Sequence, residues 1–141
     1  MKKIPPLLLL CSLFFVSSCQ ESRVSSSSFS AEQLTGKWSI VQVLAGFSSF
    51  IQEYPRNTIE WDFDTTAHTV SIQNNSTNAA DRYIFENGTY PYVITPNSSG
   101  GEGCLQTIKV HDVDLGCCTI TNGELSFSAL YLDGDYVKLV R

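Results

Sequence analysis

The chain has 141 residues, with 14 acidic and nine basic side chains and a formal net charge of −5 at pH 7. Residues 1–18 hold two of the basic residues and no acidic one, so seven basic against 14 acidic residues leave −7 on the rest. Nucleic-acid binding needs a basic stripe that displaces counterions, so we expect no nucleic-acid partner. About 100 residues beyond an N-terminal tether suffice for one domain with a modest core.

The first 18 residues have the composition of a signal peptide. Lys2 and Lys3 form a short positive region, and an apolar run from Leu7 to Val16 follows. That run is roughly half of the ~20 apolar residues that a membrane-spanning helix needs. We therefore expect a targeting segment, removed from the mature protein, rather than a permanent membrane helix.

The tetrad Val16-Ser17-Ser18-Cys19 resembles the lipobox of bacterial lipoproteins, in which the cysteine takes the lipid. The resemblance implies cleavage before Cys19, acylation of Cys19 with palmitate-like chains, and a membrane partner at the cell envelope. Gln20 is not the aspartate associated with inner-membrane retention, which favours the outer membrane, on its periplasmic or its surface face. The alternative is an ordinary secretory signal cut near Ser18, with Cys19 incidental.

Residues 19–33 are rich in serine and predict a flexible tether. The fourteen residues after Cys19 reach roughly 20 Å, which holds the following domain just off the membrane. The expected organisation is a signal peptide over residues 1–18, a tether over 19–33 and one β-barrel domain over 34–141.

Short alternating segments fill the domain. Ile59, Trp61 and Phe63 alternate with acidic residues, the period of a half-buried strand. The same period recurs at Val70/Ile72, Tyr90/Tyr92/Ile94, Ile108/Val110, Leu125/Phe127 and Val137/Leu139. The dipeptides Asn87-Gly88, Asn122-Gly123 and Asp133-Gly134 supply the positive φ that tight hairpin turns require. The sequence predicts an all-β fold, a small antiparallel up-and-down barrel of about eight strands.

Gly36-Lys37-Trp38, at the start of the first strand, resembles the Gly-x-Trp signature of the lipocalin superfamily. The resemblance implies a calycin-type barrel whose floor is plugged by Trp38 and covered by a basic side chain from the last strand, here Arg141. Such a cation–π contact contributes about 0.5–2 kcal/mol. Ser30 and Gln33 have capping-box spacing, which predicts a helical turn before Gly36 that is similar to the short helix closing the lipocalin floor.

The segment after the first strand is the candidate lid. Phe47, Phe50, Ile51 and Tyr54 fall at i, i+3, i+4 and i+7, which predicts a short helix with one apolar face. In lipocalins the connection at this place arches over the open barrel end. The segment either gates a cavity or plugs the barrel.

Five aromatic residues are expected to point into the barrel and to contact any ligand there: Trp61, Phe63, Tyr90, Tyr92 and Phe127. Eight short strands leave little space, so these rings also suffice to fill the interior.

Three cysteines remain in the domain, so at most one intramolecular disulfide forms in an oxidising compartment. Cys104 precedes one strand and Cys117 and Cys118 lie on the next. Adjacent strand residues point to opposite faces, so we expect only one of the two to pair with Cys104, and the sequence does not say which. The alternative is a strained ring between Cys117 and Cys118.

Catalytic and metal sites are not expected. His68 and His111 have no partner at metal-ligand spacing, and the chain contains neither a nucleophile elbow nor a phosphate-binding glycine loop. We expect no enzyme, no cofactor and a monomer. Three functions stay open: a carrier of a small apolar ligand, a filled interaction or inhibitor module acting through loops such as residues 97–103 on an envelope protein, and a structural envelope lipoprotein.

Overall fold

The computed structural model describes residues 28–46, 50–78, 84–98, 103–130 and 134–141. The predicted signal peptide, Cys19 and most of the predicted tether lie outside the described residues, as do Phe47 and Asp133. The elements are α1 (Ala31–Leu34), β1 (Gly36–Leu44), β2 (Ile51–Glu53), β3 (Ile59–Asp64), β4 (Thr69–Asn74), β5 (Gly88–Pro96), β6 (Gln106–Val110), β7 (Val113–Thr121), β8 (Glu124–Ser128) and β9 (Tyr136–Val140). No helix among these residues is long and apolar enough to span a membrane.

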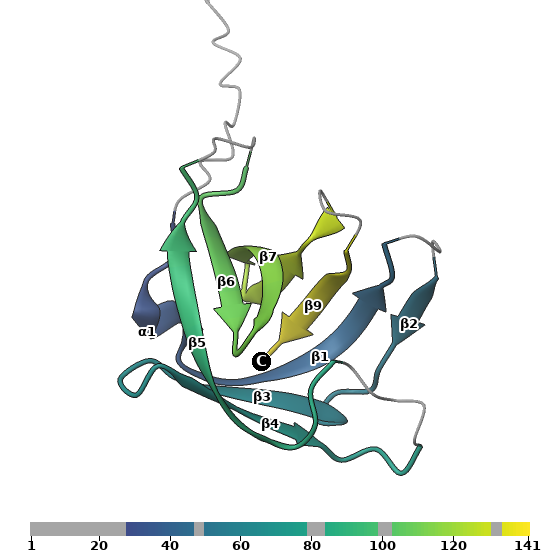
Figure 1. The fold of residues 1–141 in the computed structure, drawn as a ribbon. Helices are drawn as coiled ribbons and strands as arrows, with labels where there is room; N and C mark the ends of the chain where they lie inside the picture. The colour runs from purple at the N-terminus through teal and green to yellow at the C-terminus, as the bar shows by residue number, and fades with distance from the viewer. Residues whose placement is uncertain (1–27, 47–49, 79–83, 99–102, 131–133) are drawn as a thin grey trace, which may run out of the picture.

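Eight of the nine strands form a closed antiparallel barrel. The strand order is β2-β1-β3-β4-β5-β6-β7-β8-β9, and β1 also pairs with β9, which closes the sheet (Figure 1). Apart from the extra strand β2, each strand neighbours the next one along the chain, as in an up-and-down barrel. The predicted all-β barrel of about eight strands is confirmed.

The two ends of the barrel differ. We call the end at which β1 begins and β3 ends the floor; α1 lies against it, and Leu34 is completely buried there. The side chain of Gln33 accepts a hydrogen bond from the backbone N–H of Ser30 at 2.8 Å, which stabilises the start of the turn. We call the opposite end, where β3 begins and β4 ends, the mouth.

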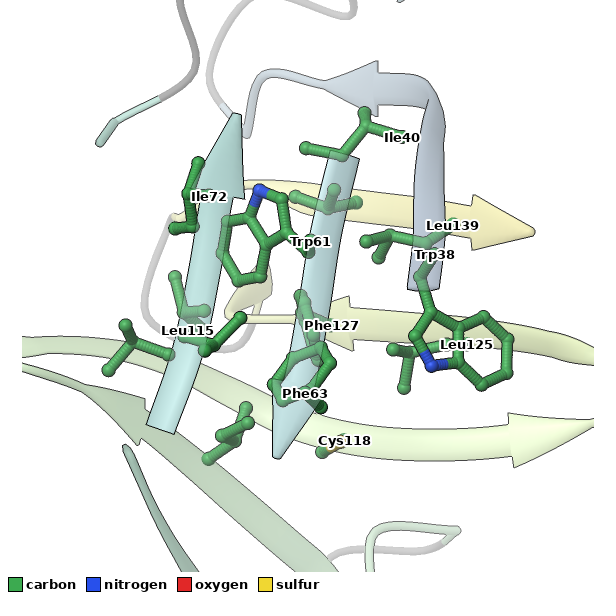
Figure 2. Close-up of a cluster of buried hydrophobic side chains, with 14 of the residues drawn as sticks. Trp38, Ile40, Trp61, Phe63, Ile72, Leu115, Cys118, Leu125, Phe127 and Leu139 are labelled. Carbon is green, nitrogen blue, oxygen red and sulfur yellow. The ribbon is translucent and has the colours of Figure 1, made fainter. Parts of the chain in front are cut away.

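Side chains from all eight barrel strands fill the interior (Figure 2). Their inward positions, each at most 5% exposed, are Trp38, Ile40, Ile59, Trp61, Phe63, Val70, Ile72, Tyr92, Ile108, Val110, Leu115, Cys118, Leu125, Phe127, Val137 and Leu139. The ring of Trp61 lies 5.6 Å from that of Phe127 and 6.1 Å from that of Phe63, centroid to centroid. These distances place the aromatic rings in direct contact in the middle of the barrel.

The predicted helix over the first connection is wrong. Ile51–Glu53 form the short strand β2, which pairs with Gln42–Leu44 of β1. The reason is that β3 pairs only with residues 36–39 of β1, so the remaining backbone groups of β1 on that side need a partner. A helix of a few residues has a costly nucleus and cannot compete with a ready sheet edge.

The turn dipeptides have different fates. Asn122 and Gly123 have φ values of 54° and 79° and join β7 to β8 in a two-residue hairpin, as predicted. The tight turn predicted at Asn87-Gly88 is wrong, because Gly88 begins β5 after a connection over residues 75–87. The Asn87 side chain instead accepts a hydrogen bond from the backbone N–H of Asn74 at 2.7 Å and thereby ties the two ends of that connection together.

A glycine pair tests the packing of β7 on β8. Gly116 has a φ of 76°, and a Cβ there would overlap the backbone of Ser128 and Ala129; Gly123 has a φ of 79°, but a Cβ would meet open space. Gly123→Ala is therefore expected to cost only the left-handed strain, about 1–2 kcal/mol. Gly116→Ala adds overpacking and is expected to cost about 3 kcal/mol or more. Urea unfolding measures both, and equal losses would contradict the close approach.

Candidate functional site

An apolar groove lies beside the floor, and we call it the floor groove. Its volume is about 460 Å³. It is lined by Phe29, Ala31, Leu34, Thr65, His68, Tyr92, Val93, Ile94 and Gln106. These residues come from α1 and the segment leading into it, from the turn between β3 and β4, and from β5 and β6. The groove therefore joins four segments that are far apart in the sequence.

The length of β5 creates this groove. Residues 88–91 of β5 pair with β4, whereas residues 92–96 pair with β6. Among the described residues no strand continues β4 beside the second half of β5. In Figure 1, β5 rises past the start of β4, with α1 beside it. The short helix α1 thus lies where a longer β4 would pair with the second half of β5. It covers only part of that surface, and the floor groove is the part that stays open.

Hydrogen bonds fix the groove's lining. The backbone N–H of Phe29 donates to Oε1 of Gln106 at 3.1 Å, which holds the entering chain against β6. The backbone N–H of Tyr92 donates to the carbonyl of His68 at 3.0 Å. The hydroxyls of Thr35 and Thr65 lie 2.6 Å apart and link α1 to the β3–β4 turn. Specific contacts therefore hold α1, the β3–β4 turn and the strands β5 and β6 together around the groove.

The chemistry of the groove suits an apolar ligand. Aliphatic and aromatic side chains form most of its walls, and Val93 is 62% exposed on the rim. The pKa of the Tyr92 hydroxyl is raised, first by burial and then by the charge of Asp64, so this group keeps its proton at neutral pH. Small-molecule sites commonly occupy about 300–1,000 Å³, with apolar walls and few polar groups. The floor groove meets this description.

A second hollow lies at the mouth, and we call it the mouth recess. Its volume is about 490 Å³, and it is lined by Asn74, Ser76, Thr77, Asn78, Phe85, Glu86 and Asn87. Phe85 is the one apolar residue among them. Its ring lies edge-on to Trp61 at 5.6 Å and 5.2 Å from Tyr90, so it separates the polar recess from the barrel interior.

The structure separates the residues predicted to form a ligand site. Trp61, Phe63, Tyr92 and Phe127 meet in the filled interior, whereas Tyr90 is half-buried near the mouth. The candidate lid does not cover them: Phe50 and Ile51 are 61% and 54% exposed, and Tyr54 alone is buried. Phe47 lies outside the described residues.

Of the residues predicted to contact a ligand, Tyr92 lines the floor groove, and sequence reasoning missed the rest of the lining of both hollows. Val93 and Ile94 carry no signal for the floor groove, because an ordinary strand has the same alternation of apolar residues. Phe85 offered a signal, since it is an aromatic residue at the end of a long connection with many polar residues.

Arg141 covers Trp38 at the floor. Its guanidinium carbon lies 4.5 Å from the centre of the indole ring, and Nη2 donates to the carbonyls of Gln33 at 2.6 Å and Thr35 at 3.0 Å. The indole Nε1 of Trp38 donates to the carbonyl of Leu34 at 2.7 Å. The last residue of the chain, the first strand and α1 are therefore joined at one place.

The cysteines form one disulfide, between Cys104 and Cys117, whose Cα atoms are 5.6 Å apart. It links the segment before β6 to β7. Cys118 faces the core as a free thiol, and burial raises its pKa. A buried protonated thiol is unreactive, so this residue acts as a small apolar side chain.

Within the described ranges, no three His, Cys, Asp or Glu side chains gather in a way that could hold a metal ion. Fold and hollows together define a small closed antiparallel β-barrel protein with surface grooves at both ends. Comparison with known proteins finds no matching family model, no similar curated protein and no similar solved structure.

Removal of the Arg141 side chain tests the floor. Arg141→Ala loses the contact with Trp38 and two hydrogen bonds to α1, and we expect a loss of about 1–2 kcal/mol in urea unfolding. Arg141→Lys keeps the charge but not the planar donor group, so it should restore only part of the loss. Lys109→Ala, at an exposed position of β6, is the control and should change stability by less than about 0.5 kcal/mol. An Arg141→Ala protein as stable as this control would contradict the contact.

Proposed function

We propose that the protein is a lipid-anchored protein of the bacterial cell envelope, at the outer membrane, whose lipocalin-like barrel binds a small apolar ligand in the floor groove. The lipobox-like tetrad ending at Cys19 supports the anchor. The Gly-x-Trp motif, the basic residue over Trp38 and the helical turn at the floor support kinship with the lipocalin-like lipoproteins. The protein acts by binding and not by catalysis.

One observation carries the choice of site. The aromatic rings of the interior already contact one another, whereas the floor groove is open, apolar and of ligand size. Binding there requires no rearrangement of the core. A preformed site binds more tightly, because no binding free energy is lost in ordering its side chains.

The groove's position fits the proposed anchor. Phe29 lines the groove and follows Cys19 by ten residues. A flexible tether of that length spans roughly 15–20 Å. The groove therefore stays close to the bilayer surface, where apolar molecules concentrate.

A charge placed on the groove's rim tests the site. Val93→Glu changes an exposed side chain, so the fold should survive, but a carboxylate beside apolar walls should weaken binding of N-phenyl-1-naphthylamine at least tenfold. Fluorescence titration measures the dissociation constant. Ile51→Glu makes the same change at a similarly exposed position of β2 and should leave the affinity unchanged. Equal affinities of Val93→Glu and the unmodified protein would rule the groove out.

A second candidate function is a protein-interaction module. Two observations favour it. The interior is filled, and Phe50 and Ile51 are largely exposed at the start of the short outer strand β2. The same two variants separate the functions. The interaction module is the better description if the unmodified protein does not bind the probe, and if Ile51→Glu abolishes cross-linking to an envelope protein while Val93→Glu does not.

Replacement of Cys19 tests the anchor. Cys19→Ala removes the proposed acylation site, so the protein should move from the membrane fraction to the soluble fraction on cell fractionation. Mass spectrometry of the unmodified protein should show an N-terminal peptide that begins at Cys19 and carries acyl chains. A protein that begins at Met1, or a Cys19→Ala variant that stays in the membrane fraction, would refute the lipid anchor.

A further inference from the structure

The two tryptophans of the chain face each other across β1 and β3 but differ in one respect. Trp38 and Trp61 are directly paired in the sheet. The indole N–H of Trp38 donates to a backbone carbonyl, whereas Nε1 of Trp61 is buried and has no hydrogen-bond partner among the residues that the structure describes. Buried polar groups are nearly always satisfied, because the lost hydrogen bond to water costs free energy. Trp61 therefore requires an explanation.

The unpaired N–H lies toward the mouth. In Figure 2 the nitrogen of Trp61 is on the side of the ring where β3 begins and β4 ends, and the nitrogen of Trp38 lies toward the opposite end. The mouth recess lies at this same end, because Asn74 at the end of β4 lines it. Phe85 contacts Trp61 and also lines the recess.

The side chains that contact Trp61 offer a buried water no polar partner. A buried water needs two to four polar neighbours. The rings that contact Trp61 are those of Phe63, Phe85 and Phe127, and its cross-strand neighbour on β4 is Ile72. None of these side chains accepts a hydrogen bond. The surroundings of Trp61 suit an apolar molecule that carries a single hydrogen-bond acceptor.

The segment that carries Phe85 is strained. Ile84 has a φ of 53°, a left-handed conformation that is a genuine outlier for a β-branched residue. Its side chain is 51% exposed, so burial of that side chain does not explain the conformation. Strain of this kind persists where the surrounding contacts hold it. The contacts of Phe85 with Trp61 and Tyr90 are such contacts, and their release would relax the backbone.

We propose that Phe85 is a displaceable plug and that the space it occupies is a second ligand site, for a single-ring aromatic molecule that carries one hydrogen-bond acceptor. The ligand enters through the mouth recess, replaces the Phe85 ring against Trp61 and accepts a hydrogen bond from Nε1. A carbonyl or ether oxygen or a ring nitrogen meets this requirement. The site is distinct from the floor groove and goes beyond the function proposed above.

A pair of matched probes tests the site. Acetophenone has one ring and a carbonyl oxygen, and ethylbenzene has nearly the same shape without an acceptor. The protein is the mature chain, residues 19–141, carrying Cys19→Ser so that no lipid competes for the probes. Two tryptophans give two indole N–H signals in a ¹H–¹⁵N spectrum, and Trp61→Phe assigns them.

We expect acetophenone to shift the Trp61 indole signal and to leave that of Trp38 in place. It should bind about tenfold more tightly than ethylbenzene, the effect of one buried hydrogen bond. Trp61→Phe keeps an aromatic ring but no donor, so the two probes should then bind equally. Phe85→Ala should tighten the binding of both probes, because no plug has to move.

Three outcomes would overturn the proposal. The first is a Trp61 signal that acetophenone does not move. The second is equal binding of the two probes to the unmodified site. The third is binding to Phe85→Ala alone, which would mean that the natural plug is not displaceable.

The background variant Val93→Glu keeps this test separate from the floor groove. The mouth site should bind acetophenone in this variant as in the unmodified protein. If acetophenone moves only the amide signals of Val93 and Ile94 in the unmodified protein, the result would support the floor groove and refute the mouth site.

Discussion

The contact between Trp38, Arg141 and α1 organises the molecule. Trp38 donates its indole N–H to Leu34, and Arg141 lies over its ring and binds the carbonyls of Gln33 and Thr35. These contacts join the first strand, the last strand and the helical turn, which are the parts of the chain that must meet for the barrel to close. Pairing of β1 with β9 completes the closure and leaves no long free edge in the barrel. The floor is thus held by a cation–π contact, by hydrogen bonds to backbone carbonyls and by the pairing of β1 with β9. Each of these interactions depends on the other two for its geometry.

A sealed floor and a filled interior determine where hollows can form. Aromatic residues already occupy the centre, and both candidate sites lie at the ends of the barrel, where neighbouring strands do not match. β5 continues past the start of β4 on the floor side, and at the mouth β4 ends at Asn74 and β5 begins only at Gly88. The first difference leaves an apolar groove beside α1, and the second leaves a polar recess above Phe85. Both candidate sites therefore follow from mismatched strands and not from a central cup.

The sequence predicts the parts of this architecture that depend on local pattern. Alternation along β3 and the Asn122-Gly123 hairpin are visible because each involves neighbouring residues. The first connection was misjudged because the spacing of Phe47, Phe50, Ile51 and Tyr54 fits a helix, while the competing partner, the free edge of β1, exists only after the sheet has formed. The choice between Cys117 and Cys118 likewise depends on which face of β7 looks inward, and period two alone does not set that phase. The floor groove could not be predicted, because it depends on the length of β5 relative to β4.

The two ends of the barrel differ in how well their polar groups are satisfied. At the floor the indole of Trp38, the carbonyls at the end of α1 and the side chain of Gln106 all have partners. At the mouth the indole of Trp61 has none, and Ile84 holds a strained backbone beside it. A barrel selected for stability alone would place an apolar residue at position 61, since the N–H costs free energy there. An unsatisfied polar group beside a strained backbone is typical of functional sites, where a protein gives up stability for a contact that the isolated chain does not make. Because the contacts at the floor hold the barrel closed, side chains at the mouth can rearrange without loss of the fold.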